Sequence, residues 1–303
     1  MATEVPWGPH RAWFDLPGGG LLVTGLDAEQ VIALRRSYPG FVKEDDAAAG
    51  GEALACRARR LPEKPDLPAA DLTRDGQYAP RIVLGADGID LTGINFRALV
   101  PLSPDCGPGW LGAVEALELV QASVIENFLR VFTAHQAVRR GGVVLHSAGL
   151  VVDGRAFLFA GRSGAGKTTL TRKGHAAGAG VLSDDINLVL PAAGGYQAHA
   201  VPFTGEFGRT LAHPGGRAAY PVAGLVLLDR GERLGVASIG ASTAIARLLV
   251  ACPFVNMEAA TSASLFDALT GMVARLPVIA LRCRRDDGFA TIMTAVTEGF
   301  AHA

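Results

Sequence analysis

The chain has 303 residues, 49% of them hydrophobic, which is enough to fill the core of one large domain or two ordinary ones. A formal net charge of -1 and a pI near 6.7, without any Lys/Arg-rich block, exclude the basic field that gathers nucleic acid. No stretch approaches the roughly 18 uninterrupted apolar residues of a membrane span. We therefore expect neither a nucleic-acid partner nor a membrane.

The N-terminus and the cysteines indicate where the protein works. Glu4, His10 and Arg11 lie where a signal peptide needs an apolar run. The four cysteines are scattered, as in a reducing cytosol, and form neither a metal-type pair nor a disulfide framework; they are Cys56, Cys106, Cys252 and Cys283. We predict a cytoplasmic protein whose cysteines are small core residues.

The first predicted division of the chain is a strand-rich N-terminal region, residues 1–111. Glycine and proline punctuate it, and short apolar runs predict strands at Gly20–Thr24, Ile82–Leu84 and Ile94–Leu99. The segment Lys43–Asp75 has no clear period and is typical of a loop-rich stretch.

A connecting helix is predicted next, within residues 112–142. Apolar residues recur there at helical spacing, and Gly141-Gly142 supplies the stop. The residues that carry this period are Leu117, Val120, Val124, Phe128 and Val131.

Residues 143–303 alternate strand and helix patterns, which favours an α/β domain with a mixed sheet. The predicted strands are Val143–Leu145, Leu150–Val152, Ala156–Ala160, Gly180–Leu182, Asn187–Leu190, Tyr196–Val201 and Gly224–Leu228. The predicted helices are Ser242–Cys252, Ser262–Arg275 and Gly288–Phe300. Asp153-Gly154 predicts a tight turn between two of the strands.

A glycine-rich loop follows the strand at Ala156–Ala160 and fits G-x-x-x-x-G-K-[ST] without a mismatch. Glycines let successive N–H groups point into one concavity at the positive end of the next helix, which suits phosphate. Lys167 would reach the β- and γ-phosphates, and the Thr168 hydroxyl would ligate Mg²⁺. The predicted nucleotide-binding residues, for ATP or another nucleoside triphosphate, are Gly161, Ser163, Gly164, Ala165, Gly166, Lys167, Thr168 and Thr169.

Two carboxylates, Asp184 and Asp185, end a short apolar strand beyond the loop. One of them can hold the Mg²⁺ that Thr168 also contacts, and the other can accept the proton of an acceptor hydroxyl. His146, at a strand end, could orient one carboxylate. The alternatives are a solvated turn for the aspartates and a structural histidine.

A second loop, Val201–Arg209, carries Glu206 and Arg209. Glu206 could reach a second metal ion, and Arg209 the phosphate or acceptor. An ordinary Pro/Gly turn with surface charges explains the loop equally well.

Three segments together resemble a known family: Leu145–Gly149, Gly161–Thr168 and Leu182–Asp185. In this order and separation they look like the catalytic domain of bacterial HPr kinase/phosphorylase, which is akin to phosphoenolpyruvate carboxykinase. The resemblance implies a P-loop kinase core with a mixed sheet, residues 143–303. It also implies that the protein is an assembly of several copies.

The resemblance assigns roles to the predicted site: Asp184 is the catalytic base, His146 supports it, Lys167 binds phosphate, and Thr168 with Asp185 forms the metal side. The implied activity is ATP- and Mg-dependent phosphorylation of a serine hydroxyl. Related proteins modify ribosomally made peptides such as lasso precursors, which favours a peptide or protein acceptor. The family's Arg-Gly-containing signature is absent after the aspartates. The alternatives are a kinase for free serine or another small molecule, a carboxykinase-like enzyme, and an ATP-sensing module without transfer.

Overall fold

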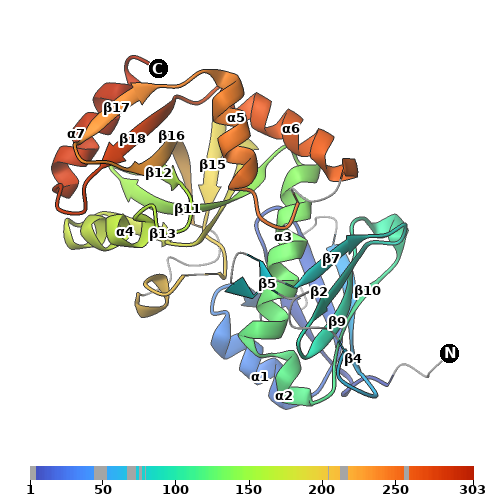
Figure 1. The fold of residues 1–303 in the computed structure, drawn as a ribbon. Coiled ribbons are helices and arrows are strands. Elements are labelled where there is room, and N and C mark those ends of the chain that lie inside the picture. Colours follow the sequence, from blue (N-terminus) through green and yellow to red (C-terminus); the bar gives the residue numbers. More distant parts are fainter. Residues whose placement is uncertain are drawn as a thin grey trace. The chain divides into compact units, whose positions relative to one another are not determined.

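The protein is an α/β protein with mixed sheets, as predicted, and the computed structural model divides it into two compact units, Met1–Gln136 and Ala137–Ala303 (Figure 1). The residues described are 5–43, 53–66, 73–74, 77–78, 80–203, 205–211, 218–255 and 259–303. Within these ranges, no helix combines the length and apolar character needed to cross a membrane.

The N-terminal unit is strand-rich and is built on one eight-stranded sheet of order β3-β1-β2-β4-β10-β9-β8-β7. β4 pairs in parallel with both β2 and β10, and the other pairings are antiparallel. Its strands are β1 (His10–Phe14), β2 (Gly20–Leu26), β3 (Val42–Lys43), β4 (Ala53–Arg60), β7 (Arg81–Leu84), β8 (Ile89–Gly93), β9 (Phe96–Val100) and β10 (Gly109–Ala113). A separate two-stranded pair consists of β5 (Thr73–Arg74) and β6 (Gln77–Tyr78).

One helix of this unit, α1 (Ala28–Ser37), was not among the predicted elements. Its start is locally encoded by a capping box: the Asp27 carboxylate accepts the Gln30 N–H, and the Gln30 side chain accepts the Asp27 N–H. Only three of its residues are buried, Gln30, Val31 and Leu34, so its buried face is too narrow to be predicted from helical periodicity.

The predicted helix within residues 112–142 is shorter and interrupted. Gly112 and Ala113 belong to strand β10, where they pair with Arg97 and Phe96. The helical segments that follow are α2 (Ala116–Leu119), the π-helix η3 (Ala122–Glu126) and α3 (Asn127–Arg139). A separate 3₁₀ turn, η2 (Pro104–Cys106), lies upstream of β10. Strand pairing with residues nonadjacent in sequence therefore overrides the helical pattern at the start of this segment.

The C-terminal unit has a seven-strand path of order β12-β11-β14-β15-β16-β18-β17, with β13 paired to β11 and β12 also paired to β16. Its strands are β11 (Val143–Val152), β12 (Arg155–Ala160), β13 (Gly180–Ser183), β14 (Ile186–Ala192), β15 (Gly195–His199), β16 (Ala219–Arg230), β17 (Gly235–Ser238) and β18 (Val278–Cys283). Its helices are α4 (Lys167–Ala176), the 3₁₀ turn η4 (Gly208–Thr210), α5 (Ala241–Val250), α6 (Ala259–Val273) and α7 (Phe289–Phe300).

Two features of this sheet differ from the prediction. The two strands expected on either side of Gly149 form the single strand β11, and β17 and β18 were not predicted. The turn at Asp153-Gly154 is as predicted: φ is 49° at Asp153 and 72° at Gly154, so both residues have the positive φ of a type I′ hairpin turn.

Three parallel strands, β12, β16 and β18, position the candidate site. β12 pairs in parallel with β16, and β16 pairs in parallel with β18. Their carboxyl ends therefore lie at one edge of the sheet, and the segments after Ala160, Arg230 and Cys283 begin there. In open α/β sheets this is the edge at which ligands bind.

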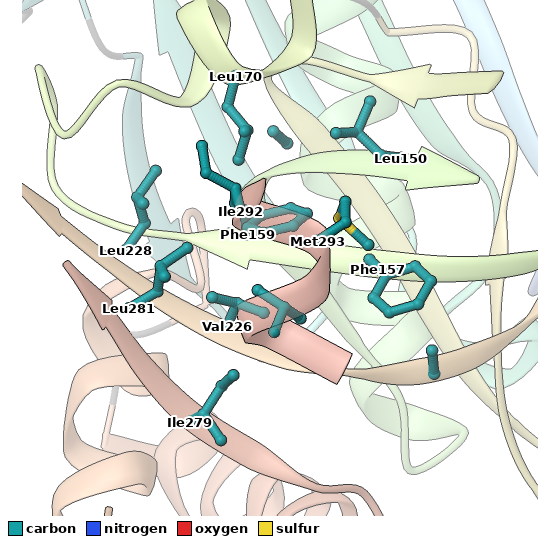
Figure 2. Close-up of a cluster of buried hydrophobic side chains, with 13 residues drawn as sticks. Leu150, Phe157, Phe159, Leu170, Val226, Leu228, Ile279, Leu281, Ile292 and Met293 are labelled. Carbon is teal, nitrogen blue, oxygen red and sulfur yellow. The ribbon is translucent and has the colours of Figure 1, made fainter. Parts of the chain in front are cut away.

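A hydrophobic core fills the space between this sheet and helices α4 and α7 (Figure 2). The strands contribute Leu150, Phe157, Phe159, Val226, Leu228, Ile279 and Leu281, and the helices contribute Leu170, Ile292, Met293 and Val296. Leu158, Leu225 and Leu227 alternate with these residues, point to the other face and are also buried. Figure 1 shows α5 and α6 on that other side of the sheet. Because the sheet is covered on both faces, its edge is the place left for a ligand.

Candidate functional site

The glycine-rich loop joins the end of β12 at Ala160 to the start of α4 at Lys167. Gly164 and Gly166 have φ of 76° and 108°, a region that L side chains rarely adopt. At Gly161 a Cβ atom would lie 2.6 Å from the carbonyl oxygen of Leu228 in β16. Backbone conformation and close strand packing thus explain these three glycines.

The first turn of α4 opens directly from this loop. Its N-cap residue, Gly166, makes no side-chain capping bond. The first N–H groups of a helix have no intrahelical acceptor, and they form the positive end of the helix dipole. Thr168 and Thr169 are half-buried in this turn, and Ser163 is exposed in the loop. The arrangement of strand, tight loop and uncapped helix start is one that binds phosphate groups.

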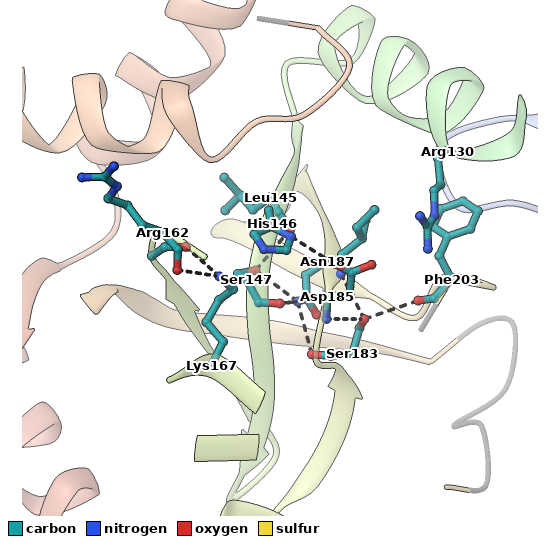
Figure 3. A network of polar contacts seen from close by, with 12 residues as sticks. Arg130, Leu145, His146, Ser147, Arg162, Lys167, Ser183, Asp185, Asn187 and Phe203 are labelled. Atoms are coloured by element: carbon teal, nitrogen blue, oxygen red, sulfur yellow. Dashed lines mark hydrogen bonds and ion pairs between the residues drawn. The ribbon is translucent and has the colours of Figure 1, made fainter. Parts of the chain in front are cut away.

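The Lys167 side chain bends back into the loop. Its Nζ donates to the carbonyl oxygens of Gly161 at 2.7 Å and Arg162 at 3.2 Å, and the residue is buried (Figure 3). Burial lowers the pKa of the Lys167 ammonium, and the negative charge of Asp185 partly opposes this effect. The loop therefore holds a cation at its centre, in electrostatic range of Asp185.

His146 and Asp185 lie within hydrogen-bonding distance of each other at the same sheet edge. The distance from His146 Nδ1 to Asp185 Oδ1 is 2.9 Å, and both side chains are partly exposed. The strand register brings them together: Ser147 pairs with Ala160, so His146 lies level with the start of the loop, and His146 pairs with Ile186, the neighbour of Asp185. Lys167, His146 and Asp185, which were predicted from three separate sequence motifs, are thus neighbours.

A buried polar network supports this pair from behind. Asn187 Nδ2 donates to the carbonyl oxygen of Ser147 at 2.7 Å and to its hydroxyl at 3.0 Å. The Ser183 hydroxyl accepts the backbone N–H groups of Asp185 and Ile186 at 3.2 and 3.1 Å. These residues join β11 to β13 and β14, as Figure 3 shows. The sequence signal for this network is a set of small polar residues within apolar strands.

Asp184 faces a different direction from Asp185. Its Oδ2 accepts the backbone N–H of Phe207 at 3.1 Å, and its Oδ1 accepts that of Gly208 at 3.0 Å. The residue is only 4% exposed, and a Cβ on Gly205 would lie 2.6 to 2.7 Å from its carboxylate atoms. Asp184 therefore anchors the segment 205–211 at the end of β13.

Glu206 and Arg209 lie on that anchored segment and are both exposed. Phe207 packs between them against α4, with its ring 5.7 Å from the His175 ring and 5.4 Å from the Arg172 guanidinium carbon. Among the described residues, no group of three or more His, Cys, Asp or Glu could hold a metal ion. The roles of Glu206 in metal binding and Arg209 in acceptor binding remain predictions.

The cysteines are all free, and only two of them are fully buried core residues. Burial raises the pKa of the Cys252 thiol to about 12 and raises that of Cys56 further. Cys106 and Cys283 are half-buried. Cys283 ends β18 at the edge that carries the loop, which the sequence did not indicate.

Fold and site together define the class: an α/β protein with mixed sheets and a glycine-rich loop between a strand and a helix. The family model that matches the chain is described as SynChlorMet cassette protein ScmC, and it covers residues 115–297. Since this is more than half of the 303 residues, the chain belongs to that family. No curated protein matches the chain.

This family assignment corrects the predicted one. The resemblance to HPr kinase/phosphorylase is wrong as a statement of membership, because the matching family is ScmC and not an HPr kinase family. The resemblance rested on short motifs, and a phosphate-binding loop followed by acidic residues occurs in many unrelated nucleotide-binding proteins. The matched range nevertheless contains all the predicted site residues, from His146 to Arg209.

Proposed function

We propose that the protein transfers a phosphoryl group from a nucleoside triphosphate, such as ATP, to a hydroxyl acceptor. The observation that carries the proposal is the convergence of Lys167, inside the glycine-rich loop, with the His146–Asp185 pair at one sheet edge. A phosphate-binding cation next to a paired proton acceptor is the arrangement that phosphoryl transfer to a hydroxyl needs. The proposal includes a P-loop kinase core as the fold of the catalytic domain and the cytoplasm as its location.

The loop and α4 would bind the phosphates. Backbone N–H groups at the start of α4 point toward the loop, and Lys167 would exchange its two loop carbonyls for phosphate oxygens. The Thr168 hydroxyl and the Asp185 carboxylate are oxygen donors of the kind that Mg²⁺ prefers when nucleotide phosphates supply the remaining ligands. Bound there, Mg²⁺ would neutralise charge on the phosphates.

The acceptor proton would go to His146. Its Nδ1 is held by Asp185, which fixes the ring and supports the positive charge that forms when Nε2 takes the proton. The acceptor oxygen forms a bond to the γ-phosphorus as the bond from that phosphorus to the bridging oxygen breaks, and the nucleoside diphosphate leaves. Asp184 is assigned a supporting role instead, because both of its oxygens accept backbone N–H groups.

The acceptor we propose is a serine hydroxyl on a peptide or protein. The 205–211 segment, anchored beside the aspartates, exposes Glu206, Arg209 and Thr210, and it supports the proposal as a surface that an extended acceptor could follow. A second candidate function is a nucleotide-binding module without transfer. It is favoured by the engagement of Asp184, the carboxylate predicted to be the base, in structural hydrogen bonds.

The test uses purified protein, Mg²⁺, ATP labelled on the γ-phosphate and a mixture of serine-containing peptides. Lys167→Ala should abolish nucleotide binding and transfer, whereas His146→Gln should bind ATP and lose transfer by at least about 100-fold. His302→Gln, which alters an exposed residue, serves as the matched control. Tight ATP binding by the wild type with neither transfer nor hydrolysis would favour the binding module, and transfer unaffected by His146→Gln would rule out its proposed role.

A further inference from the structure

A cavity of about 480 Å³ lies beside the glycine-rich loop and is not used by any step proposed above. One side is formed by the loop and α4, through Gly166, Thr169 and Lys173, and the other by the ends of two strands, through Arg230, Cys283 and Arg284. The volume falls within the roughly 300–1,000 Å³ typical of small-molecule sites. The cavity is thus large enough for an organic ligand next to the phosphate-binding loop.

The position of the cavity follows from the sheet. β12, β16 and β18 are mutually parallel, so the loop after Ala160, the turn at Arg230-Gly231 and the turn after Cys283 all start at one edge. The cavity is lined by all three of these segments. A ligand whose phosphates lie in the loop therefore has its remaining part directed along this edge.

The far wall of the cavity is held in place by Lys173. Its Nζ donates to the carbonyl oxygen of Arg285 at 2.6 Å and to that of Asp287. The Asp287 carboxylate in turn accepts the backbone N–H of Arg284 at 2.6 Å. α4, which starts at the loop, is thereby tied to the turn after β18, and these contacts hold the two walls of the cavity together.

The lining combines apolar and cationic groups. Leu170 and Ile292, members of the hydrophobic core, supply an apolar surface, and the Cys283 thiol lies beside them. Arg230, Arg284 and Arg285 add planar guanidinium groups. That of Arg284 donates from Nε to Asp286 Oδ1 at 2.8 Å and from Nη2 to Asp286 Oδ2, which leaves its flat faces available. An Arg230 Nη2 atom lies 3.8 Å from the point where a Cβ on Gly164 would be, so this side chain reaches the loop. Flat cations over an apolar floor suit the π-face of a base, and hydrogen-bond donors suit ribose and base acceptor atoms.

We propose that this cavity binds the ribose and base of the nucleotide whose phosphates the glycine-rich loop holds. Arg230 lies where the phosphate chain meets the nucleoside, and Arg284 and Cys283 lie against the base. Lys173 is a positioning residue that shapes the wall. The proposal rests on the proposed function, because it places the nucleoside relative to phosphates in the loop.

The experiment compares two probes, ATP and inorganic tripolyphosphate, each with Mg²⁺, by calorimetric titration of the full chain. Cys283→Phe fills part of the cavity and Arg284→Ala removes one exposed wall group. Each should weaken ATP binding by about tenfold, the effect of losing one good contact, and leave tripolyphosphate binding unchanged. Lys167→Ala should abolish the binding of both probes. Arg155→Ala, an exposed arginine at the opposite end of β12, is the matched control.

The outcomes separate the two proposals. If Cys283→Phe and Arg284→Ala both bind ATP with unchanged affinity while Lys167→Ala binds neither probe, the nucleoside site is overturned and the phosphate site is supported. Failure of the wild type to bind either probe overturns both proposals. If Cys283→Phe does not fold, Arg284→Ala decides, together with thiol labelling of Cys283 in a Cys106→Ser background. ATP should slow that labelling, and tripolyphosphate should not.

Discussion

Replacement of Asp184 tests whether this carboxylate is a structural anchor. Asp184→Ala removes the acceptor of two backbone N–H groups, those of Phe207 at 3.1 Å and Gly208 at 3.0 Å. Gly208 is buried and Phe207 is half-buried, so water cannot fully replace the lost bonds. The substitution should therefore release the 205–211 segment and destabilise the unit that contains it.

The size of the effect follows from these contacts. A hydrogen bond to a charged group contributes about 1.5–3 kcal/mol, and the half-buried donor recovers part of its loss through water. We expect Asp184→Ala to lower the free energy of unfolding by about 2–4 kcal/mol. For a unit the size of Ala137–Ala303 this corresponds to a decrease in Tm of roughly 5–15 °C.

The comparison is with Asp185→Ala, which breaks the partly exposed contact to His146 and should cost less than about 1 kcal/mol. Thermal unfolding followed by circular dichroism gives both Tm values, and the labelled-ATP assay gives transfer. Asp185→Ala should keep its Tm and lose transfer. A Tm for Asp184→Ala within 1–2 °C of the wild type, or a larger decrease for Asp185→Ala, would refute the assignment of Asp184 as the anchor.

Two further predictions concern packing and titration. Gly161→Ala places a Cβ 2.6 Å from the Leu228 carbonyl, so we expect it to weaken ATP binding at least about tenfold. Gly178→Ala, at a position with open space but a φ of 87°, should destabilise the end of α4 without changing affinity. Burial raises the pKa of Cys252 from 9.0 to about 12, so the folded protein keeps a proton that the unfolded chain loses above pH 9. Relative to Cys252→Ala, the wild type should lose about 1.4 kcal/mol of unfolding free energy between pH 8 and pH 10, measured with urea; parallel pH profiles would contradict this.

Several elements could be predicted because their signals are local. The turn at Asp153-Gly154 needs two residues with positive φ, and this pair adopts that conformation readily. Helices α5 and α7 lie within about two residues of their predicted bounds, since each carries an apolar stripe at helical spacing. Strand β18 was missed because its six residues show no period that distinguishes a buried strand from other apolar runs.

The roles within the candidate site could not be predicted in the same way. Asp184 and Asp185 are neighbours with the same chemistry, and their order in the sequence does not say which one meets a backbone turn and which meets His146. That difference arises from the 205–211 segment and from the register of β11 with β14. The cavity beside the loop is likewise formed by segments that are more than 100 residues apart, as the contact between Lys173 and Asp287 illustrates.

By itself, the sequence determined the glycine-rich loop, its lysine and the strand and helix on either side, because glycine conformation and apolar period act over a few residues. Only the tertiary structure decided which polar groups share the sheet edge with that loop. The physical reason is that strand pairing and parallel packing join distant segments. Their register, which no local rule supplies, sets the direction of each side chain.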